Sequence, residues 1–413
     1  MTQRPRKALI IGAGIAGPIA AILLRHAGIE THVFEAWPHS TGAGSGLQIA
    51  PNGMRVLAEL GLAPDLIRRG AICESIDFYS QSGAPLGSVN RNMAERFGQP
   101  SVSLRRAVLN EAIIGKAWSS NVELYFEKRL ARIEDRPNQP IVAHFTDGSS
   151  AEGDFLIGAD GVHSAVREHV VPDAPKPFDT GLLGFGGFVP RSLLEAAGAR
   201  ASLAMTFGRS GFFGFGYCGP EPRDGAMCWS TQPAHGVDAA TFRAMDQAAL
   251  RQHLQGFHAG WHDPIPQLID SLEEIVVTAT LDVAALPTWS RGRMLLIGDA
   301  AHATSPHAGQ GASIALEDAY RLARALRSED EIGIAFQNFE AERRPRAERV
   351  VALARRNGNQ KREFGATGAW IRDRMIKVLT PFTARSWDWI YDYDVRAVTA
   401  PPQMSGRHDR RAA

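Results

Sequence analysis

The chain has 413 residues, 44% hydrophobic and 22% charged, with 45 Lys and Arg against 44 Asp and Glu. These ordinary values argue against a disordered, collagen-like or coiled-coil chain, and the length predicts two or three domains. The formal charge of +1 gives no general attraction to nucleic acid or to an anionic membrane, so neither is an expected partner. The 41 glycines exceed the usual share of about 7%, so their positions are informative.

The first predicted unit is a strand, a tight turn and a helix. Ala8–Ile11 is a short apolar run typical of a buried parallel strand, and Gly12-Ala13-Gly14-Ile15-Ala16-Gly17 follows it directly. Helical spacing then continues to Gly28, a suitable left-handed cap. A second strand, Thr31–Phe34, ends at Glu35, which completes one βαβ unit.

Two features bear on where the protein is located. The uncharged run 8–24 superficially resembles a signal peptide, but glycines and Pro18 interrupt it and no small-residue cleavage site follows. We therefore expect no stable membrane insertion. Three scattered cysteines are too few for a disulfide framework or a zinc site, which favours a cytoplasmic location.

Further elements follow with less regular spacing. A glycine-dense loop covers Gly42–Gly46, and a helix is predicted over Arg106–Trp118. Ile141–Phe145 and Phe155–Ile157 are predicted as strands around an Asp147-Gly148 turn, which is a hairpin signal.

The character of the chain changes between residues 178 and 282. Aromatic and glycine-rich stretches such as 211–217 replace the α/β alternation there and predict a separate sheet domain. The alternation of strand and helix resumes with a predicted strand at Met294–Ile297 and a long predicted helix from Gly311 to Leu326. The arginines from Arg343 to Arg349, with Arg355 and Arg356, are expected on a solvated helix face.

The glycine turn has the context that a dinucleotide-binding motif needs. Gly12 would make the turn, Gly14 would let the backbone approach a pyrophosphate, and Gly17 would let helix and strand pack closely. Glu35 follows Gly12 by 35 − 12 = 23 positions, where it can accept from a ribose hydroxyl. A glycine-rich packing turn with a solvated Glu is the alternative.

Two more glycine-aspartate clusters follow predicted strands. One is Gly158–Arg167, which contains Asp160-Gly161, and the other begins at Gly298-Asp299 and continues to Gly311. With all three motifs in this order, the chain resembles the single-component FAD-dependent aromatic hydroxylases, the para-hydroxybenzoate hydroxylase-like flavoprotein monooxygenases. The resemblance covers most of residues 1–360.

The resemblance implies an α/β fold with a Rossmann-like FAD-binding domain of three layers around a mostly parallel sheet. It also implies an inserted, largely antiparallel sheet domain for the substrate and a C-terminal helical segment. The expected boundaries are 1–72, 96–177 and 283–330 for the FAD-binding domain, 73–95 and 178–282 for the substrate domain, 331–404 for the C-terminal helices, and 405–413 for a disordered tail.

The resemblance also assigns cofactor-binding roles by position. Arg106 is matched to the flavin-binding arginine of the family, although its neighbour Arg105 is an alternative. The N-terminus of the helix at Gly311 would stabilise the anionic reduced flavin. The assigned set is Gly12, Gly14, Ala16, Gly17, Glu35, Ala36, Gly46, Arg106, Leu130, Asp160, Asp299, Gly309, Gly311 and Ala312. For Asp160 and Asp299 a helix-capping role stays open, and for Arg106 a surface pairing with Glu111.

The substrate side is less defined. Alternation places three aromatic residues on one strand face, where they would stack on a substrate ring; the alternative is that this face is the core contact of the sheet. The candidate substrate residues are Arg209, Phe213, Phe215, Tyr217 and Pro306. No catalytic group can be named, and His302 and His307 lack an HExxH arrangement, so no metal is expected. Ser313 stands where an asparagine is frequent in the family.

The implied reaction is hydroxylation of a small aromatic, heteroaromatic or polyketide-like substrate. NADH or NADPH would bind transiently and reduce FAD, and O2 would give a flavin hydroperoxide that transfers one oxygen atom. Two alternatives stay open: an FAD-dependent reductase or dehydrogenase without oxygen insertion, and a non-catalytic flavin-binding module. The sequence specifies neither the substrate, nor NADH against NADPH, nor whether the protein is a monomer or a homodimer.

Overall fold

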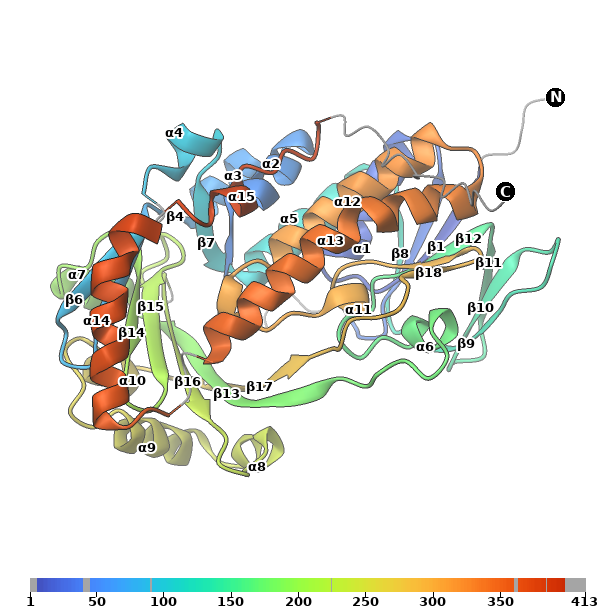
Figure 1. Ribbon diagram of the computed structural model, residues 1–413. Helices are drawn as coiled ribbons and strands as arrows, with labels where there is room; N and C mark the ends of the chain where they lie inside the picture. The colour runs from blue at the N-terminus through green and yellow to red at the C-terminus, as the bar shows by residue number, and fades with distance from the viewer. Residues whose placement is uncertain are drawn as a thin grey trace, which may run out of the picture.

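The computed structural model describes residues 6–39, 45–89, 91–223, 225–359, 363–383 and 385–397. Residues 42–44 of the predicted glycine loop and the predicted tail at 405–413 lie outside these ranges. Figure 1 shows an α/β part and a second sheet, with the long helix α13 running beside both. Within the described residues, no helix combines the length and apolar character needed to cross a membrane.

A six-stranded, mostly parallel sheet forms the centre of the α/β part. Its strand order is β18-β19-β12-β1-β2-β8, and only the edge strand β18 is antiparallel to its neighbour. The strands are β1 (Lys7–Ile11), β2 (Glu30–Phe34), β8 (Glu123–Tyr125), β12 (Phe155–Gly158), β18 (Ser290–Arg291) and β19 (Met294–Leu296). The predicted βαβ unit is confirmed as β1, α1 (Ala16–His26) and β2.

Strand β1 is buried on both faces because each face packs against a different layer. A methyl group added at Gly17 of α1 would lie 3.4 Å from Ile10, whereas one added at Gly153 would lie 2.8 Å from Leu9. Gly153 ends the meander β9 (Leu130–Glu134), β10 (Ile141–Phe145) and β11 (Ser150–Gly153). The helical layer contains α1, α5 (Arg106–Ser119) and α12 (Gly311–Ser328), which confirms the three-layer arrangement.

The hairpin prediction is wrong in its second strand. Strand β10 turns at Asp147-Gly148 and pairs with β11, while Phe155–Ile157 belongs to β12, which runs parallel to β1. Strand β11 is short and polar and lies on the meander edge, so it has no apolar signature. The fully buried β12 has the apolar run that parallel strands need.

The second sheet has seven strands in the order β17-β13-β16-β15-β14-β5-β6, and all pairs are antiparallel except β14 with β5. Two separate segments of the chain, 75–89 and 178–282, supply it. The strands are β5 (Ser75–Ser80), β6 (Pro85–Val89), β13 (Phe178–Val189), β14 (Ser202–Phe207), β15 (Phe212–Tyr217), β16 (Ala226–Pro233) and β17 (Val276–Asp282). One face packs against α8 (Ala239–Arg243), α9 (Gln247–Phe257) and α10 (Ile265–Asp270).

Small elements connect the two parts. Strands β3 (Gly46–Ile49), β7 (Ser101–Arg105) and β4 (Ala71–Cys73) form a three-stranded sheet. The short helices are α2 (Pro51–Glu59), α3 (Ala63–Arg69), α4 (Met93–Phe97), α6 (Val166–Val170), α7 (Arg191–Ala196), α11 (Asp299–His302) and the 3-10 turn η1 (Pro306–Ala308).

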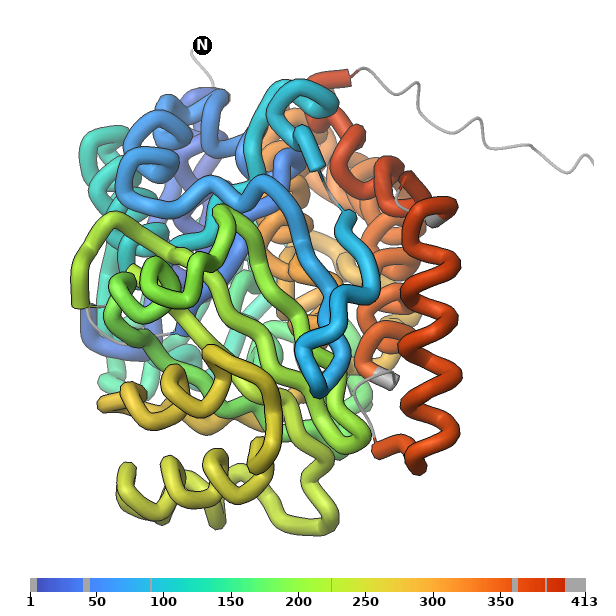
Figure 2. The backbone as a smooth tube through the Cα atoms, turned by 90° about the vertical axis from the view of Figure 1, so that its left-hand side faces the viewer, coloured from blue at the N-terminus to red at the C-terminus, as the bar shows by residue number. Residues whose placement is uncertain are grey.

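Three helices follow the α/β core. Helix α13 (Ile332–Asn359) packs along α12, and α14 (Ala366–Thr383) packs against β6 at the edge of the second sheet. Figure 2 shows α14 standing at the outside of the molecule. Helix α15 (Asp388–Tyr391) returns to α2, where Arg55 donates to the backbone carbonyl groups of Tyr391 and Tyr393.

Candidate functional site

The three glycines of the turn after β1 have two different roles: two allow close backbone packing, and one leaves the backbone accessible. Gly12 has a φ of +107°, and a methyl group there would lie 2.3 Å from the carbonyl oxygen of Ala159. A methyl group at Gly17 would lie 2.0 Å from the carbonyl oxygen of Gly12. At Gly14 it would meet no protein atom within 4 Å. Gly12 and Gly17 are therefore required by the fold, whereas Gly14 faces open space.

Glu35 reaches back from the end of β2 to this turn. Its Oε2 accepts the backbone N–H of Ala13 at 2.7 Å, and its Oε1 accepts that of Trp37 at 3.0 Å. The indole of Trp37 is 66% exposed, and the Arg129 guanidinium lies 4.8 Å from its ring centroid. Leu130 follows this arginine and is half-buried at the start of β9. These residues form one edge beside the glycine turn.

Asp160 caps helix α6 through both carboxylate oxygens. Oδ1 accepts the Ser164 hydroxyl at 2.5 Å, and Oδ2 accepts the backbone N–H groups of Ala165 and Val166 at 2.8 and 3.1 Å. Desolvation by burial raises the pKa of Asp160, although these hydrogen bonds oppose the shift. The capping role that the sequence left open for Asp160 is thus the one its contacts show.

Arg167 joins the two aspartate loops, a connection that sequence reasoning missed. Among the described residues its buried guanidinium donates only to backbone carbonyl oxygens, and burial lowers the pKa of Arg167. The acceptors are Val162 (2.8 Å), Ala300 (2.9 Å), Asp299 (3.1 Å) and Gly161 (3.4 Å). The available signal was an arginine at the end of a glycine-rich loop, where carbonyl groups are within reach. One side chain therefore fixes the loop after β12 to the loop after β19.

Asp299 begins α11 with an exposed side chain that accepts no hydrogen bond from the described part of the chain. Desolvation by the surrounding protein atoms raises the pKa of Asp299, against the opposing charges of His302, Arg106 and Arg167. Arg106 is also exposed, and its side chain makes no hydrogen bond to a described residue. The pair thus presents opposite charges toward solvent at the sheet edge where β19 ends.

Arg105 and Arg106 point to different surroundings. The Arg105 guanidinium lies 4.9 Å from the ring centroid of Phe188 on the second sheet. Arg106 begins α5, and its charge acts on Asp299. Among the two candidate arginines, Arg106 therefore lies with the aspartate loop and Arg105 with the second sheet.

The loop before α12 is held in place by a hydrogen bond between two buried amide side chains. Gly309 has a φ of +60°, and Gln310 is buried with its Oε1 accepting from Asn52 at 3.1 Å. The Ser313 hydroxyl accepts the backbone N–H of Ala50 at 3.1 Å. The serine that departs from the family pattern thus caps the N-terminus of α2.

The remaining predicted cofactor residues lie at the ends of elements around these loops. They are Ala16 at the start of α1, Ala36 directly after β2, Gly46 at the start of β3, and Gly311 and Ala312 in the first turn of α12.

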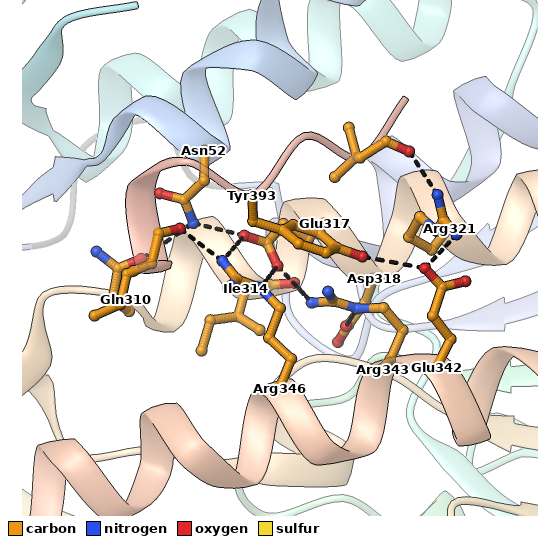
Figure 3. A network of polar contacts seen from close by, with 12 residues as sticks. Asn52, Gln310, Ile314, Glu317, Asp318, Arg321, Glu342, Arg343, Arg346 and Tyr393 are labelled. Carbon is orange, nitrogen blue, oxygen red and sulfur yellow. Dashed lines mark hydrogen bonds and ion pairs between the residues drawn. The ribbon is translucent and has the colours of Figure 1, made fainter. Parts of the chain in front are cut away.

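Beneath these loops lies a buried ionic network (Figure 3). Asp318 accepts from the backbone N–H of Gly298 at 3.0 Å and from Arg343 at 2.9 Å, and its contact with His302 is 2.5 Å. Burial alone would raise the pKa of Asp318, but His302 and Arg343 lower it to about 2. Burial alone would lower the pKa of His302, but Asp318 raises it.

Glu317 extends the network toward α2. Its carboxylate contacts Arg343 and Arg346 at 2.7 Å each and accepts from Asn52 at 2.6 Å. Arg343 is fully buried, and Arg355 pairs with Asp282 on the second sheet. The expectation of a solvated arginine face is therefore wrong for Arg343 and Arg346, whose charges are compensated by buried carboxylates on α12. It is confirmed for Arg349, Arg355 and Arg356, which are exposed.

The predicted aromatic substrate face points away from the α/β part. Phe213 and Phe215 are buried in the core formed with α8, α9 and α10, and Tyr217 lies 4.4 Å from Arg191. Arg209 is exposed in the turn between β14 and β15. The structure thus places these three aromatic residues in the core contact of the sheet, which was the alternative.

The opposite face of the same sheet meets the α/β part. A methyl group at Gly46 would lie 2.1 Å from the sulfur of Met227, and Arg105 lies over Phe188. Trp229 and Met205 are half-buried on this face. Pro306, in the 3-10 turn η1, is exposed. Alternation along β16 indicates that Met227 and Trp229 share one face of the sheet, but it does not indicate which face meets the α/β part.

Comparisons with known proteins agree with this geometry. The family model of the FAD binding domain matches residues 6–354. A 3-amino-4-hydroxybenzoate 2-monooxygenase of Streptomyces platensis is 32% identical over 96% of this chain and 98% of its own. A 6-hydroxynicotinate 3-monooxygenase of Pseudomonas fluorescens is 30% identical over 96% of each chain. The chain belongs to the family of single-component FAD-dependent aromatic hydroxylases.

Solved structures extend the comparison to the fold. HpxO of Klebsiella pneumoniae, in complex with FAD and uric acid, is 28% identical with a TM-score of 0.82. The alignment covers 92% of this chain and 95% of that one. A salicylate hydroxylase substrate complex, 22% identical with a TM-score of 0.76, shares the fold. The resemblance and the fold class predicted from the sequence are confirmed.

Proposed function

We propose that this hydroxylase uses NADH or NADPH and O2 to hydroxylate a small, electron-rich aromatic or heteroaromatic ring. Each turnover would convert one ring C–H to C–OH and consume one NAD(P)H, one proton and one O2, with the second oxygen atom leaving as water. The observation that carries the proposal is the open approach at Gly14, where a methyl group would meet no protein atom within 4 Å. Packing requires Gly12 and Gly17 but not Gly14, so close approach of a ligand to the backbone is what accounts for a glycine at this position.

The residues present fit FAD. The N–H groups after Gly12 and the N-terminus of α1 would receive the pyrophosphate, and Glu35 would exchange its contact with Ala13 for a ribose hydroxyl. Asp299 would accept from the ribityl or pyrophosphate region, with Arg106 nearby. The first turn of α12 would stabilise negative charge on the reduced isoalloxazine ring. When bound, FAD supplies the hydride acceptor and the activation of O2.

The substrate would lie against the sheet face that carries Phe188, Met205, Met227 and Trp229. Aromatic and thioether groups suit a flat ring, since they offer polarisable apolar surface. The relatives act on 3-amino-4-hydroxybenzoate and 6-hydroxynicotinate, and HpxO binds uric acid, so we infer a ring of similar size for this protein. This position differs from the predicted aromatic face.

The nicotinamide donor would bind only transiently. The chain carries no second glycine-rich βαβ fingerprint, so its reducing end would approach FAD from the open side. We also propose a reducing cytoplasmic location, which the three buried cysteine thiols support.

The test is substrate-stimulated NAD(P)H oxidation by the FAD-loaded protein, with 3-amino-4-hydroxybenzoate, 6-hydroxynicotinate, urate and salicylate as first compounds. Incorporation of one atom of ¹⁸O from ¹⁸O₂ into the product supports the proposal. Turnover without incorporation would identify a reductase or dehydrogenase, and a protein that cannot be loaded with FAD would refute the cofactor assignment. Asp299→Asn should weaken FAD binding, whereas Asp154→Asn, outside these loops, should not.

A further inference from the structure

Helix α14 exposes an unusual amount of apolar surface. Its outer side carries six large hydrophobic residues with exposed fractions between 45% and 84%: Trp370, Ile371, Met375, Val378, Leu379 and Phe382. Elsewhere in the described chain, exposed large hydrophobic residues lie scattered over other elements: Trp37, Ile72, Trp118, Phe178, Val237, Met245 and Ile334. Single exposed hydrophobic residues are common, but a contiguous patch marks an interaction site.

The inner side of α14 already fixes the helix to the protein. Arg372 donates to the backbone carbonyl of Gly208 at 2.7 Å and pairs with Asp373. A methyl group at Gly87 of β6 would lie 2.8 Å from Thr380. The exposed side is therefore not needed to anchor α14, and Figure 2 shows the helix at the edge of the molecule.

The spacing of the exposed residues fits another helix. Ile371, Met375, Val378 and Phe382 follow one another by four, three and four positions, the repeat of a two-helix seam. The exposed cations Arg374 and Lys377 lie together on one rim of this seam, and Arg374 lies 5.4 Å from the ring centroid of Trp370. A stripe this narrow suits a helix better than a flat lipid surface.

We propose that α14 is a homodimer interface, in which a second copy of this chain packs its own α14 antiparallel across a two-fold axis. With the seam centred between Met375 and Val378, each of these residues faces the other in the partner copy, and Ile371 faces Phe382. No other described helix has a comparable exposed apolar stripe. The α14 stripe is therefore the described surface best suited to pack against the same surface of a second copy.

The area is sufficient for a stable pair. Large aromatic side chains present roughly 150 to 250 Å² each and aliphatic ones somewhat less, so the exposed parts of the four seam residues give on the order of 450 Å² per copy. With Trp370 and Leu379, which flank the seam, the area reaches roughly 600 Å² per copy. Two copies would then bury about 1,200 Å², which exceeds the ~1,000 Å² expected of a biological interface. The same area left in water would favour aggregation.

The experiment measures the mass of the FAD-loaded full chain by light scattering and its association by sedimentation velocity. We expect twice the 44.8 kDa of one chain, and at least a tenfold rise in the dissociation constant for Met375→Glu. Met375→Leu should still form the dimer, and Ile334→Glu, which adds a charge at an exposed apolar residue of α13, is the matched control. Circular dichroism and bound-FAD absorbance verify that each variant is folded.

Three outcomes would overturn the proposal. The first is a wild-type protein that stays monomeric at 100 μM, and the second is a Met375→Glu variant that stays dimeric. The third is a monomer that co-sediments with vesicles of anionic phosphatidylglycerol and loses this binding in Met375→Glu, which would assign α14 to a lipid surface.

Discussion

Two glycines of one turn should respond in opposite ways to the same substitution. In Gly14→Ala the new methyl group meets no protein atom within 4 Å, and Gly14 is not among the residues with positive φ. The FAD-free variant should therefore unfold with a free energy equal to that of the wild type or up to about 1 kcal/mol higher, because alanine restricts the unfolded chain. In Gly17→Ala the methyl group would overlap the carbonyl oxygen of Gly12, costing about 1 to 3 kcal/mol or more.

The order reverses for FAD binding. A methyl group at Gly14 would keep the pyrophosphate from one or two backbone N–H groups, each charge-assisted bond contributing about 1.5 to 3 kcal/mol, so affinity should fall at least about tenfold. Urea unfolding of the FAD-free protein and titration with FAD, followed by flavin fluorescence, separate the two effects. A Gly14→Ala variant that binds FAD as tightly as the wild type, or a Gly17→Ala variant as stable as the wild type, would contradict these assigned roles.

Three further predictions concern the buried network and the substrate face. Arg343→Met leaves buried carboxylates without compensation and should cost about 3 to 5 kcal/mol in urea unfolding, whereas the exposed Arg132→Met should cost under about 1 kcal/mol. Asp318 raises the pKa of His302, so stability from this pair is complete below about pH 6.5 and declines as pH rises through the folded pKa. The stability advantage of the wild type over His302→Gln should therefore be larger at pH 6 than at pH 9, and an equal advantage would contradict the linkage. Trp229→Phe should change KM for the aromatic substrate while altering the free energy of unfolding by less than about 1.5 kcal/mol; an unchanged KM would place the substrate elsewhere.

Local signals predicted much of the α/β part. The run Ala8–Ile11, the glycine turn and the helix from Gly311 each carry their structure in a short window, and all three lie where expected. The hairpin after Ile141 failed because the edge strand β11 is polar and shows no apolar alternation. Apolar content alone therefore pairs the run 141–145 with the run 155–157, although the second run belongs to the central sheet.

Side-chain placement depended on long-range packing that periodicity does not contain. Alternation along β15 correctly places Phe213 on the opposite face of the sheet from Phe212 and Gly214. Both faces of β15 are buried, however, so no local signal distinguishes the face covered by helices from the face toward the FAD-binding domain. The buried position of Arg343 likewise depends on Glu317, 26 residues earlier on another helix. The glycines near Gly214 make room for large side chains: a methyl group there would lie 2.3 Å from the Trp229 ring.

The bridge made by Arg167 has a consequence for biosynthesis. Its acceptors Asp299 and Ala300 lie 132 and 133 residues after Arg167 in the chain. Strand β19, which leads into their loop, is synthesised only after the whole second sheet. A nascent chain that ends before residue 294 has the glycine turn and the loop with Asp160 but lacks the loop with Asp299. The complete set of loops proposed to hold FAD therefore exists only after the second sheet has been synthesised, so FAD loading would report that both halves of the chain have been made.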